Sequence, residues 1–154
     1  MSVTQDGVWL HFDLGAPLRV LSWSLTNPGL VTSNAMVWRE VKNSDLTPDL
    51  DVNDWYGRAL DEKGWGAAVA FLTSRDISTW VEAKAAVEGV TAHAVATVGL
   101  SNGERVGARV DYSSRDWNGS WGTINVGLKV SEGLSEAGLN ELLAIAVQAR
   151  TAAV

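Results

Sequence analysis

Two short runs of almost wholly apolar residues, Gly66–Leu72 and Val90–Leu100, most constrain the fold of this 154-residue chain. Each run is far shorter than the ~18 apolar residues that a membrane-spanning helix needs, and both have the length of a strand. A strand with so little polar alternation is typically buried on both faces and lies inside a sheet that helices cover. We therefore expect an α/β fold in which both runs are central strands.

Alternation of bulky and polar residues predicts further strands around these two runs. The five further strands are Val8–Leu14, Leu18–Leu25, Ala35–Val41, Val106–Tyr112 and Trp121–Val130, of which the last two form a hairpin. Apolar residues at helical spacing predict helices at Asp49–Lys63, Asp76–Glu88 and Ser135–Thr151, with Asp76 and Ser135 as N-caps. The pattern predicts a mixed β-sheet with helices packed on it, in a single domain that covers residues 1–154.

The charge and composition of the chain exclude several classes of partner and of catalytic site. The net charge of −6 repels the phosphates of nucleic acids and anionic lipids, so we expect neither a nucleic acid nor a membrane as partner. The chain has no cysteine, HExxH motif or carboxylate cluster, so we expect no metal site. The N-terminus lacks a basic patch followed by an apolar run, so we expect a cytoplasmic protein without a signal peptide. The sequence leaves a homo-oligomer open.

The predicted strand Trp121–Val130 has one polar and one apolar face. Because side chains alternate along a strand, Thr123, Asn125 and Lys129 share the polar face. The apolar face holds Ile124, Val126, Leu128 and Val130. The polar face either meets water or forms a wall that contacts amide groups.

A second polar segment follows the apolar run that begins at Val90. Residues 97–103, with the sequence Thr-Val-Gly-Leu-Ser-Asn-Gly, leave the strand and turn sharply. Ligands of sheets with crossover helices collect at the carboxyl ends of strands, and Gly99 lets the backbone approach a ligand closely. Ser101 and Asn102 are then donors at the mouth of a pocket; the alternative is an ordinary Ser-Asn-Gly turn.

Two further kinds of side chain are of interest. His93 lies in a predicted buried strand, where it is either a hydrogen-bonded core residue or a base at the strand end. Tryptophan is unusually frequent, with eight residues against two phenylalanines and two tyrosines. These indoles either fill the core or form a stacking surface for a flat ligand.

These motifs resemble those of the adenosylcobinamide amidohydrolases, from about Pro17 to the C-terminus. The family's Thr-Ala-Gly-x-Ser-Asn is similar to Thr97-Val98-Gly99-Leu100-Ser101-Asn102, and its Gly-Thr-Ile-Asn matches Gly122-Thr123-Ile124-Asn125. Three more segments are similar: Leu21-Ser22 with Asn27 and Gly29, Phe71-Leu72-Thr73, and Ala149-Arg150-Thr151-Ala152-Ala153. All five segments occur in the family's order, which makes the resemblance specific.

The resemblance implies hydrolysis of the amide between a corrin ring and its aminopropanol arm, giving adenosylcobyric acid in corrinoid salvage and cobalamin biosynthesis. Ser101, Asn102, Thr123 and Asn125 would hold and polarise this amide for attack by water, with His93 as the candidate base. The implied substrate-binding residues are Ser22, Asn27, Thr73, Thr97, Gly99, Gly122, Gln148 and Arg150. Trp23, Trp38 and Trp121 would pack on the macrocycle. The corrinoid is the expected substrate, and no cofactor is expected.

Three positions depart from the family pattern. Val147-Gln148-Ala149-Arg150 stands where the family has Thr-Glu-Ala-Lys, and the amide of Gln148 cannot act as a base. Pro28 interrupts the family's Asn-Gly-Gly, and Trp38 replaces an Asn. Two alternatives therefore stay open: a diverged member that binds a corrinoid or another tetrapyrrole without cleaving it, and an unrelated tryptophan-rich interaction domain.

Overall fold

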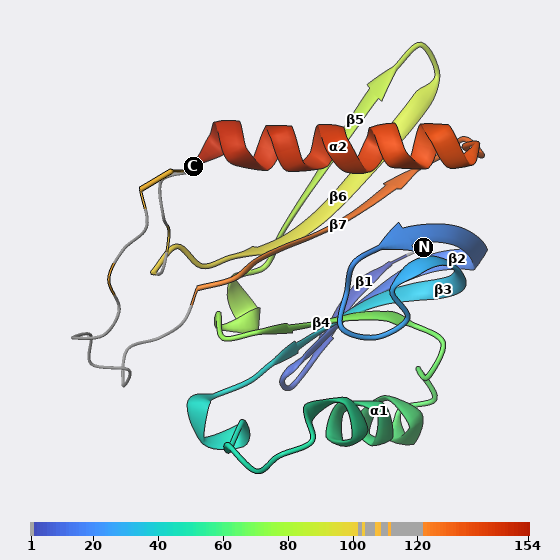
Figure 1. Ribbon diagram of the computed structural model, residues 1–154. Coiled ribbons are helices and arrows are strands. Elements are labelled where there is room, and N and C mark those ends of the chain that lie inside the picture. The colour runs from blue at the N-terminus through green and yellow to red at the C-terminus, as the bar shows by residue number, and fades with distance from the viewer. Residues whose placement is uncertain (1, 102, 104–106, 109–110, 112–121) are drawn as a thin grey trace.

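The computed structural model describes residues 2–101, 103, 107, 108, 111 and 122–154, and these form two β-sheets and two α-helices (Figure 1). Sheet A has the order β1 (Val3–Asp6), β2 (Trp9–Ser22), β3 (Gly29–Glu40) and β4 (Val69–Thr73). Sheet B has the order β5 (Val81–Val87), β6 (Val90–Val98) and β7 (Ile124–Val130). The helices are α1 (Val52–Glu62) and α2 (Glu136–Ala153), with 3-10 turns η1 (Asn43–Asp45) and η2 (Ile77–Thr79). The predicted α/β class is confirmed.

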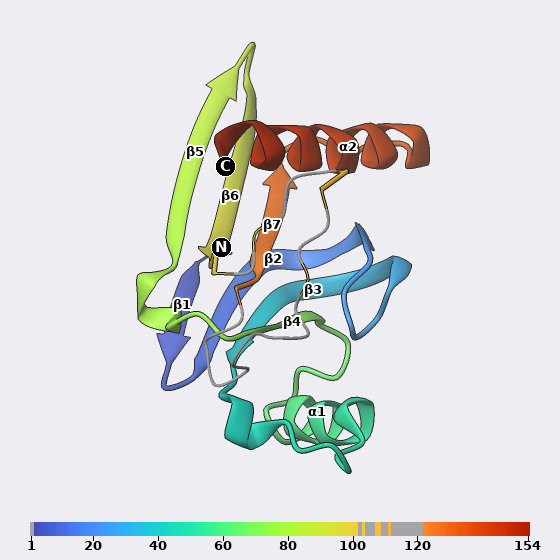
Figure 2. The same ribbon diagram turned by 60° about the vertical axis from the view of Figure 1, so that its left-hand side comes forward.

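The elements stack in four layers, in the order α1, sheet A, sheet B and α2 (Figure 1). Figure 2 shows that α2 crosses β6 and β7, and that the β5–β6 hairpin projects past the helix. Sheet A packs against sheet B on one face and against α1 on the other, because side chains alternate along its strands. Leu10 and Phe12 face sheet B, whereas Trp9 packs with Tyr56 and Leu60 of α1. Only the β3–β4 pair is parallel among the described strand pairs.

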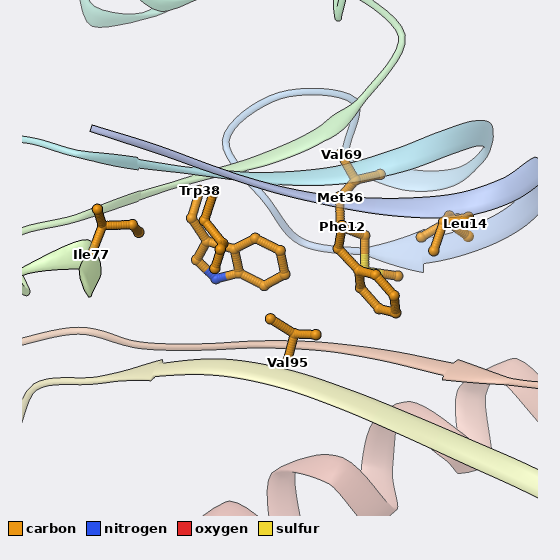
Figure 3. Packing of buried hydrophobic residues seen from close by; sticks show 9 residues of the cluster. Phe12, Leu14, Met36, Trp38, Val69, Ile77 and Val95 are labelled. Atoms are coloured by element: carbon orange, nitrogen blue, oxygen red, sulfur yellow. The ribbon is translucent and has the colours of Figure 1, made fainter. Parts of the chain in front are cut away.

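The core between the sheets is built around Trp38, whose side chain is completely buried. Figure 3 shows its indole between the sheets, with Val95 of β6 opposite. Gly127 of β7 lies directly over this ring, because a Cβ built there would be 2.7 Å from both Trp38 Cη2 and Met36 Sδ. The indole therefore sets how closely β7 approaches sheet A.

Helix α1 lies within the predicted helix Asp49–Lys63 but begins three residues later. Asp51 is the N-cap and accepts a hydrogen bond from the Asp54 backbone N–H at 3.0 Å, and Gly64 follows the helix with a φ of +72°. The buried Tyr56 hydroxyl donates to the Phe71 carbonyl at 2.8 Å, which ties α1 to β4. Burial raises the pKa of Tyr56, so this donor stays protonated.

The predicted helix at Asp76–Glu88 is wrong. Asp76 caps only the single turn η2, by accepting a hydrogen bond from the Ser78 backbone N–H at 2.9 Å, and the chain then continues as β5. Of the apolar residues at helical spacing in this segment, Val81 and Val87 lie on β5, where their odd-numbered positions share one face. Glu88 and Gly89 both have positive φ, at 50° and 85°, and form the two-residue turn that favours a hairpin with β6. Strand pairing therefore overrode the helical pattern.

Three other strand predictions needed correction. The segment Gly66–Leu72 does contain a strand, β4, which is largely buried between the layers on its two faces. However, β4 is the last strand of sheet A among the described residues, so its predicted central position was wrong. The predicted strands Val8–Leu14 and Leu18–Leu25 are one strand, β2, with a register shift between Asp13 and Leu18. The single predicted sheet is divided into two stacked sheets.

The predicted hairpin between Val106–Tyr112 and Trp121–Val130 is only partly described. Most of Val106–Tyr112 lies outside the described residues, as does Trp121. The described part of the second strand is β7, which pairs antiparallel with β6.

Helix α2 contributes little to the core. Ser135 caps it as predicted, accepting a hydrogen bond from the Gly138 backbone N–H at 3.1 Å, but none of its described side chains is fully buried. The ion pair between Arg19 and Glu136 spans 3.8 Å, and both side chains are more than half exposed, so it adds little stability. No helix among the described residues is both long and apolar enough to cross a membrane.

Substitution of Gly127 by Ala tests the inter-sheet packing. Because the new methyl group must displace Trp38 or Met36 in a filled core, we expect the free energy of unfolding to fall by about 1–3 kcal/mol in urea titrations. Gly133→Ala is the matched control, since a Cβ there meets nothing within 4 Å. Equal stability of the two variants would contradict the proposed packing.

Hydrogen exchange tests the weak attachment of α2. We expect the amides of α2 to exchange faster than those of α1, because α1 buries Tyr56 and Leu60 whereas α2 buries no described side chain. Peptide-resolved exchange measured by mass spectrometry compares the two helices in one sample. Protection of α2 equal to that of α1 would show a firmer attachment than its packing indicates.

Candidate functional site

A pocket of about 370 Å³ lies between α2, β7 and sheet A. Its floor includes Val20, Met36 and Val69 of sheet A, and its walls come from consecutive β7 residues 124–129 and from the half-buried face of α2. The α2 residues that line it are Leu139, Leu142, Leu143, Ala146, Val147 and Arg150. The apolar stripe of α2 therefore covers a cavity instead of a packed core.

The charged residues that line this pocket are all of one sign, although Arg19 is paired with Glu136 outside the lining. Arg19, Lys129 and Arg150 line it, and none of its described lining residues is a carboxylate or a histidine. This is unusual in a chain whose net charge is −6. A locally basic, largely apolar pocket favours a ligand with a large apolar surface and attracts negative charge.

Trp23 lines this pocket and is 66% exposed, which makes it the most accessible of the described indoles for stacking. Leu25 is also an exposed lining residue. Trp38, by contrast, is completely buried between the sheets, so the expectation that it packs on a ligand is wrong. Trp121 lies outside the described residues.

The polar face of β7 is directed at sheet A. The Asn125 side-chain amide donates to the Leu72 carbonyl at 2.8 Å, and Lys129 Nζ donates to the Leu14 carbonyl at 2.6 Å. Just before the strand, the Thr123 hydroxyl donates to the Thr73 hydroxyl at 3.1 Å. Of the two interpretations of this face, contact with water alone is wrong, because these side chains bind backbone carbonyls of the opposite sheet.

The two sequence motifs are neighbours in space. The Gly99 backbone N–H donates to the Thr123 carbonyl at 2.9 Å, and Thr97 is paired with Asn125 across the β6–β7 ladder. Gly99 and Gly122 pass so closely that a Cβ on Gly122 would collide with the Gly99 carbonyl. Both glycines are therefore required by close approach of the two chain segments.

Several buried polar atoms near this junction lack a hydrogen-bond partner among the described residues. They include the Thr97 hydroxyl, Trp38 Nε1 and the Ser74 hydroxyl. Thr97 is two residues after Val95 and therefore lies on the same face of β6. Figure 3 shows the Trp38 nitrogen on the side of Ile77, away from Met36. Buried polar groups are normally hydrogen-bonded, because leaving them unpaired costs free energy. The end of β6 therefore carries a hydroxyl for which the described residues supply no hydrogen-bond partner.

His93 lies in the interior, apart from the residues that line the pocket. Its Nε2 is 2.8 Å from Glu82 Oε2, and its ring packs edge-on against Phe12, with centroids 4.7 Å apart. Glu82 was not considered a partner from the sequence because its segment was predicted to be helical. The β5–β6 pairing is what brings the two side chains together.

The other predicted site residues are divided between the pocket and its surroundings. Ser22 and Arg150 line the pocket, whereas Gln148 is exposed and is not among the lining residues. Asn27 donates to the carbonyls of Gly66 at 3.0 Å and Ala68 at 2.8 Å, holding the loop before β4. Ser101 is exposed, and Asn102 lies outside the described residues.

Sequence reasoning missed three features of this region. Arg19 and Lys129 were not identified as pocket residues, because their roles depend on how β2 and β7 meet. Ser74 follows the predicted Phe71-Leu72-Thr73 segment directly and was not singled out.

No group of three or more potential metal ligands was found among the residues that the structure describes.

Comparison with known proteins identifies the family. A family model described as adenosylcobinamide amidohydrolase matches residues 2–154. The searches of curated proteins and of solved structures found no match to this chain. The family match covers nearly every residue, including both motifs that meet at Gly99 and Gly122 and the helix that covers the pocket. The chain therefore belongs to the adenosylcobinamide amidohydrolase family.

Proposed function

We propose that this protein hydrolyses the amide between the corrin ring and the aminopropanol arm of adenosylcobinamide-type corrinoids, giving adenosylcobyric acid for corrinoid salvage. The observation that carries the proposal is the pocket itself, which joins an apolar wall, an exposed indole and the Asn125 amide. Pockets for small ligands range from about 300 to 1,000 Å³, so one of about 370 Å³ admits part of a corrinoid. The scissile arm enters, and the rest of the macrocycle stays at the mouth.

Asn125 is the group proposed to polarise the scissile carbonyl. One N–H of its amide is held by the Leu72 carbonyl, which fixes the orientation of the second N–H. A donor held in place stabilises the oxyanion of a tetrahedral intermediate without reorganisation. Thr97, Thr73 and Thr123 act as positioning residues, since they surround the β6–β7 junction from which Asn125 projects. Ser101 follows this junction, and its assignment as a donor rests on the motif alone.

Water is the proposed nucleophile. Its oxygen adds to the carbonyl carbon, the carbon–nitrogen bond breaks, and the amide nitrogen takes up both protons of the water, so the products are a carboxylate and a protonated aminopropanol amine. Lys129 and Arg150 place positive charge at the pocket, which favours the developing oxyanion and the carboxylate. Water is the only co-reactant in this scheme, so we expect no added cofactor.

Trp23 and the apolar wall are proposed to hold the macrocycle. An aromatic side chain can stack on a flat conjugated ring. An exposed aromatic side chain can do so while giving up few of its contacts with the protein. Trp23 meets this condition, at 66% exposure beside the pocket. The leucines of α2 then cover the opposite side of the entering arm.

A second candidate function is corrinoid binding without turnover. It is favoured by the absence of any carboxylate or histidine from the described residues that line the pocket. The exposed Gln148 replaces the family's Glu, so Gln148→Glu is the variant that asks whether a lost base can be restored. Trp38→Asn is unsuitable for this purpose, because it would remove the central side chain of the inter-sheet core.

Incubation of the wild-type protein with adenosylcobinamide, followed by mass spectrometry, tests the reaction. We expect adenosylcobyric acid and free aminopropanol to accumulate in proportion to the protein added. Tight binding without either product, in the wild type and in Gln148→Glu, would instead support the binding function.

Substitution of Asn125 by Ala tests the polarising donor. Loss of one oxyanion donor lowers kcat by about 10²–10³-fold in other hydrolases, and we expect a decrease of that size. Asn140→Ala is the matched control, because Asn140 is an exposed residue of α2 whose side-chain amide donates to the Glu136 carbonyl one turn earlier. An unchanged kcat in Asn125→Ala, with the fold intact by circular dichroism, would contradict the assignment.

Substitution of Trp23 by Ala tests stacking on the macrocycle. An aromatic contact contributes about 0.5–1.5 kcal/mol beyond area burial, so we expect the Kd for adenosylcobinamide to rise about 3–10-fold. Equilibrium dialysis measures this value without relying on indole fluorescence. Trp23→Phe should retain most of the affinity, and Val87→Ala, at an exposed site outside the pocket, should retain all of it. Equal affinities of the Trp23→Ala variant and the wild type would remove the stacking role.

A further inference from the structure

The outer edge of β7 forms one wall of the pocket and carries a second recognition surface. We propose that the backbone N–H and C=O groups of Ile124, Val126 and Leu128 bind primary-amide side arms of the corrinoid, as a neighbouring strand would. The identity of the ligand rests on the proposed function, but the edge itself is defined by the hydrogen-bonding pattern of sheet B.

The phase of the β6–β7 ladder determines which backbone groups point outward. Gly99 N–H donates to the Thr123 carbonyl at 2.9 Å, and Ser131 N–H donates to the Thr91 carbonyl at 2.8 Å. The register between these two bonds is continuous, so the odd-numbered residues of β7 exchange hydrogen bonds with β6. The even-numbered residues therefore direct both of their backbone groups away from β6.

These outward groups belong to residues that line the pocket. Ile124, Val126 and Leu128 are all among its lining residues, and β7 is the last strand of sheet B in the part of the chain that the structure describes. No backbone–backbone hydrogen bond from another described segment reaches them. Backbone groups beside apolar walls gain from a bound partner, because water reaches them less freely than at an open surface.

A primary amide has the chemistry that this edge requires. Its carbonyl accepts one hydrogen bond and its NH₂ group donates, so one arm can pair with both groups of a single residue. Outward residues recur every second position, about 7 Å apart along a strand, which suits separate arms around one macrocycle. Cobinamide carries several such arms on the ring edge. A carboxylate arm lacks the donor and cannot form the same pair.

Val126→Pro tests the edge with little disturbance of the ladder. Proline removes the backbone N–H, and at residue 126 this N–H points outward, so β6 loses no hydrogen bond. Val126→Ala is the matched control, because it shortens the same side chain and keeps the N–H. We expect the Kd for adenosylcobinamide, measured by equilibrium dialysis, to be about 3–10-fold higher for the proline variant than for the alanine variant.

A backbone ester at residue 126 provides a second variant in case proline unfolds the strand. Incorporation of the hydroxy acid analogue of valine replaces the same N–H by oxygen and keeps the side chain, and we expect a similar loss of affinity. The inference would be overturned if the folded proline variant had the same affinity as Val126→Ala, or if the ester variant had the same affinity as the wild type. If the wild type binds adenosylcobinamide without cleaving it and the proline variant binds more weakly, the edge is supported and the proposed reaction fails. If the wild type cleaves it and the variants bind equally, only the edge proposal fails.

Discussion

The contact between Trp38 and Gly127 is the constraint on which the rest of this structure depends. The indole fills the space between the two sheets, and the missing side chain at residue 127 lets β7 lie directly on it. With β7 at that height, Asn125 reaches the Leu72 carbonyl and Lys129 reaches the Leu14 carbonyl. The same contact thus aligns the polar face of β7 with sheet A and leaves its outer edge along the pocket.

Most of the local structure could be predicted from the sequence, because it depends on neighbouring residues. The capped helices α1 and α2 and the alternating strands β2, β3 and β7 follow from periodicity and N-caps that are visible in the chain. The segment at Asp76–Glu88 was misjudged because its apolar residues fit both a helical and a strand pattern. Only pairing with β6, through the turn at Glu88 and Gly89, decides between them.

The candidate site was partly predictable for a similar reason. Gly99, Thr123 and Asn125 were identified from two short motifs, and these motifs do meet in the structure. The basic lining of the pocket was not predicted, because Arg19, Lys129 and Arg150 come from three elements that only tertiary packing brings together. Trp38 illustrates the opposite error, since residue type suggested a ligand contact where burial shows a core role.

The loose packing of α2 has a consequence for how this protein can change over time. Its inward leucines face the cavity, and none of its described side chains is fully buried. Substitutions on that face therefore alter the shape of the binding space at little cost to the stability of the fold. On the α2 side, the side chains that shape the cavity are separate from those that form the inter-sheet core, so this wall can change while the scaffold is kept.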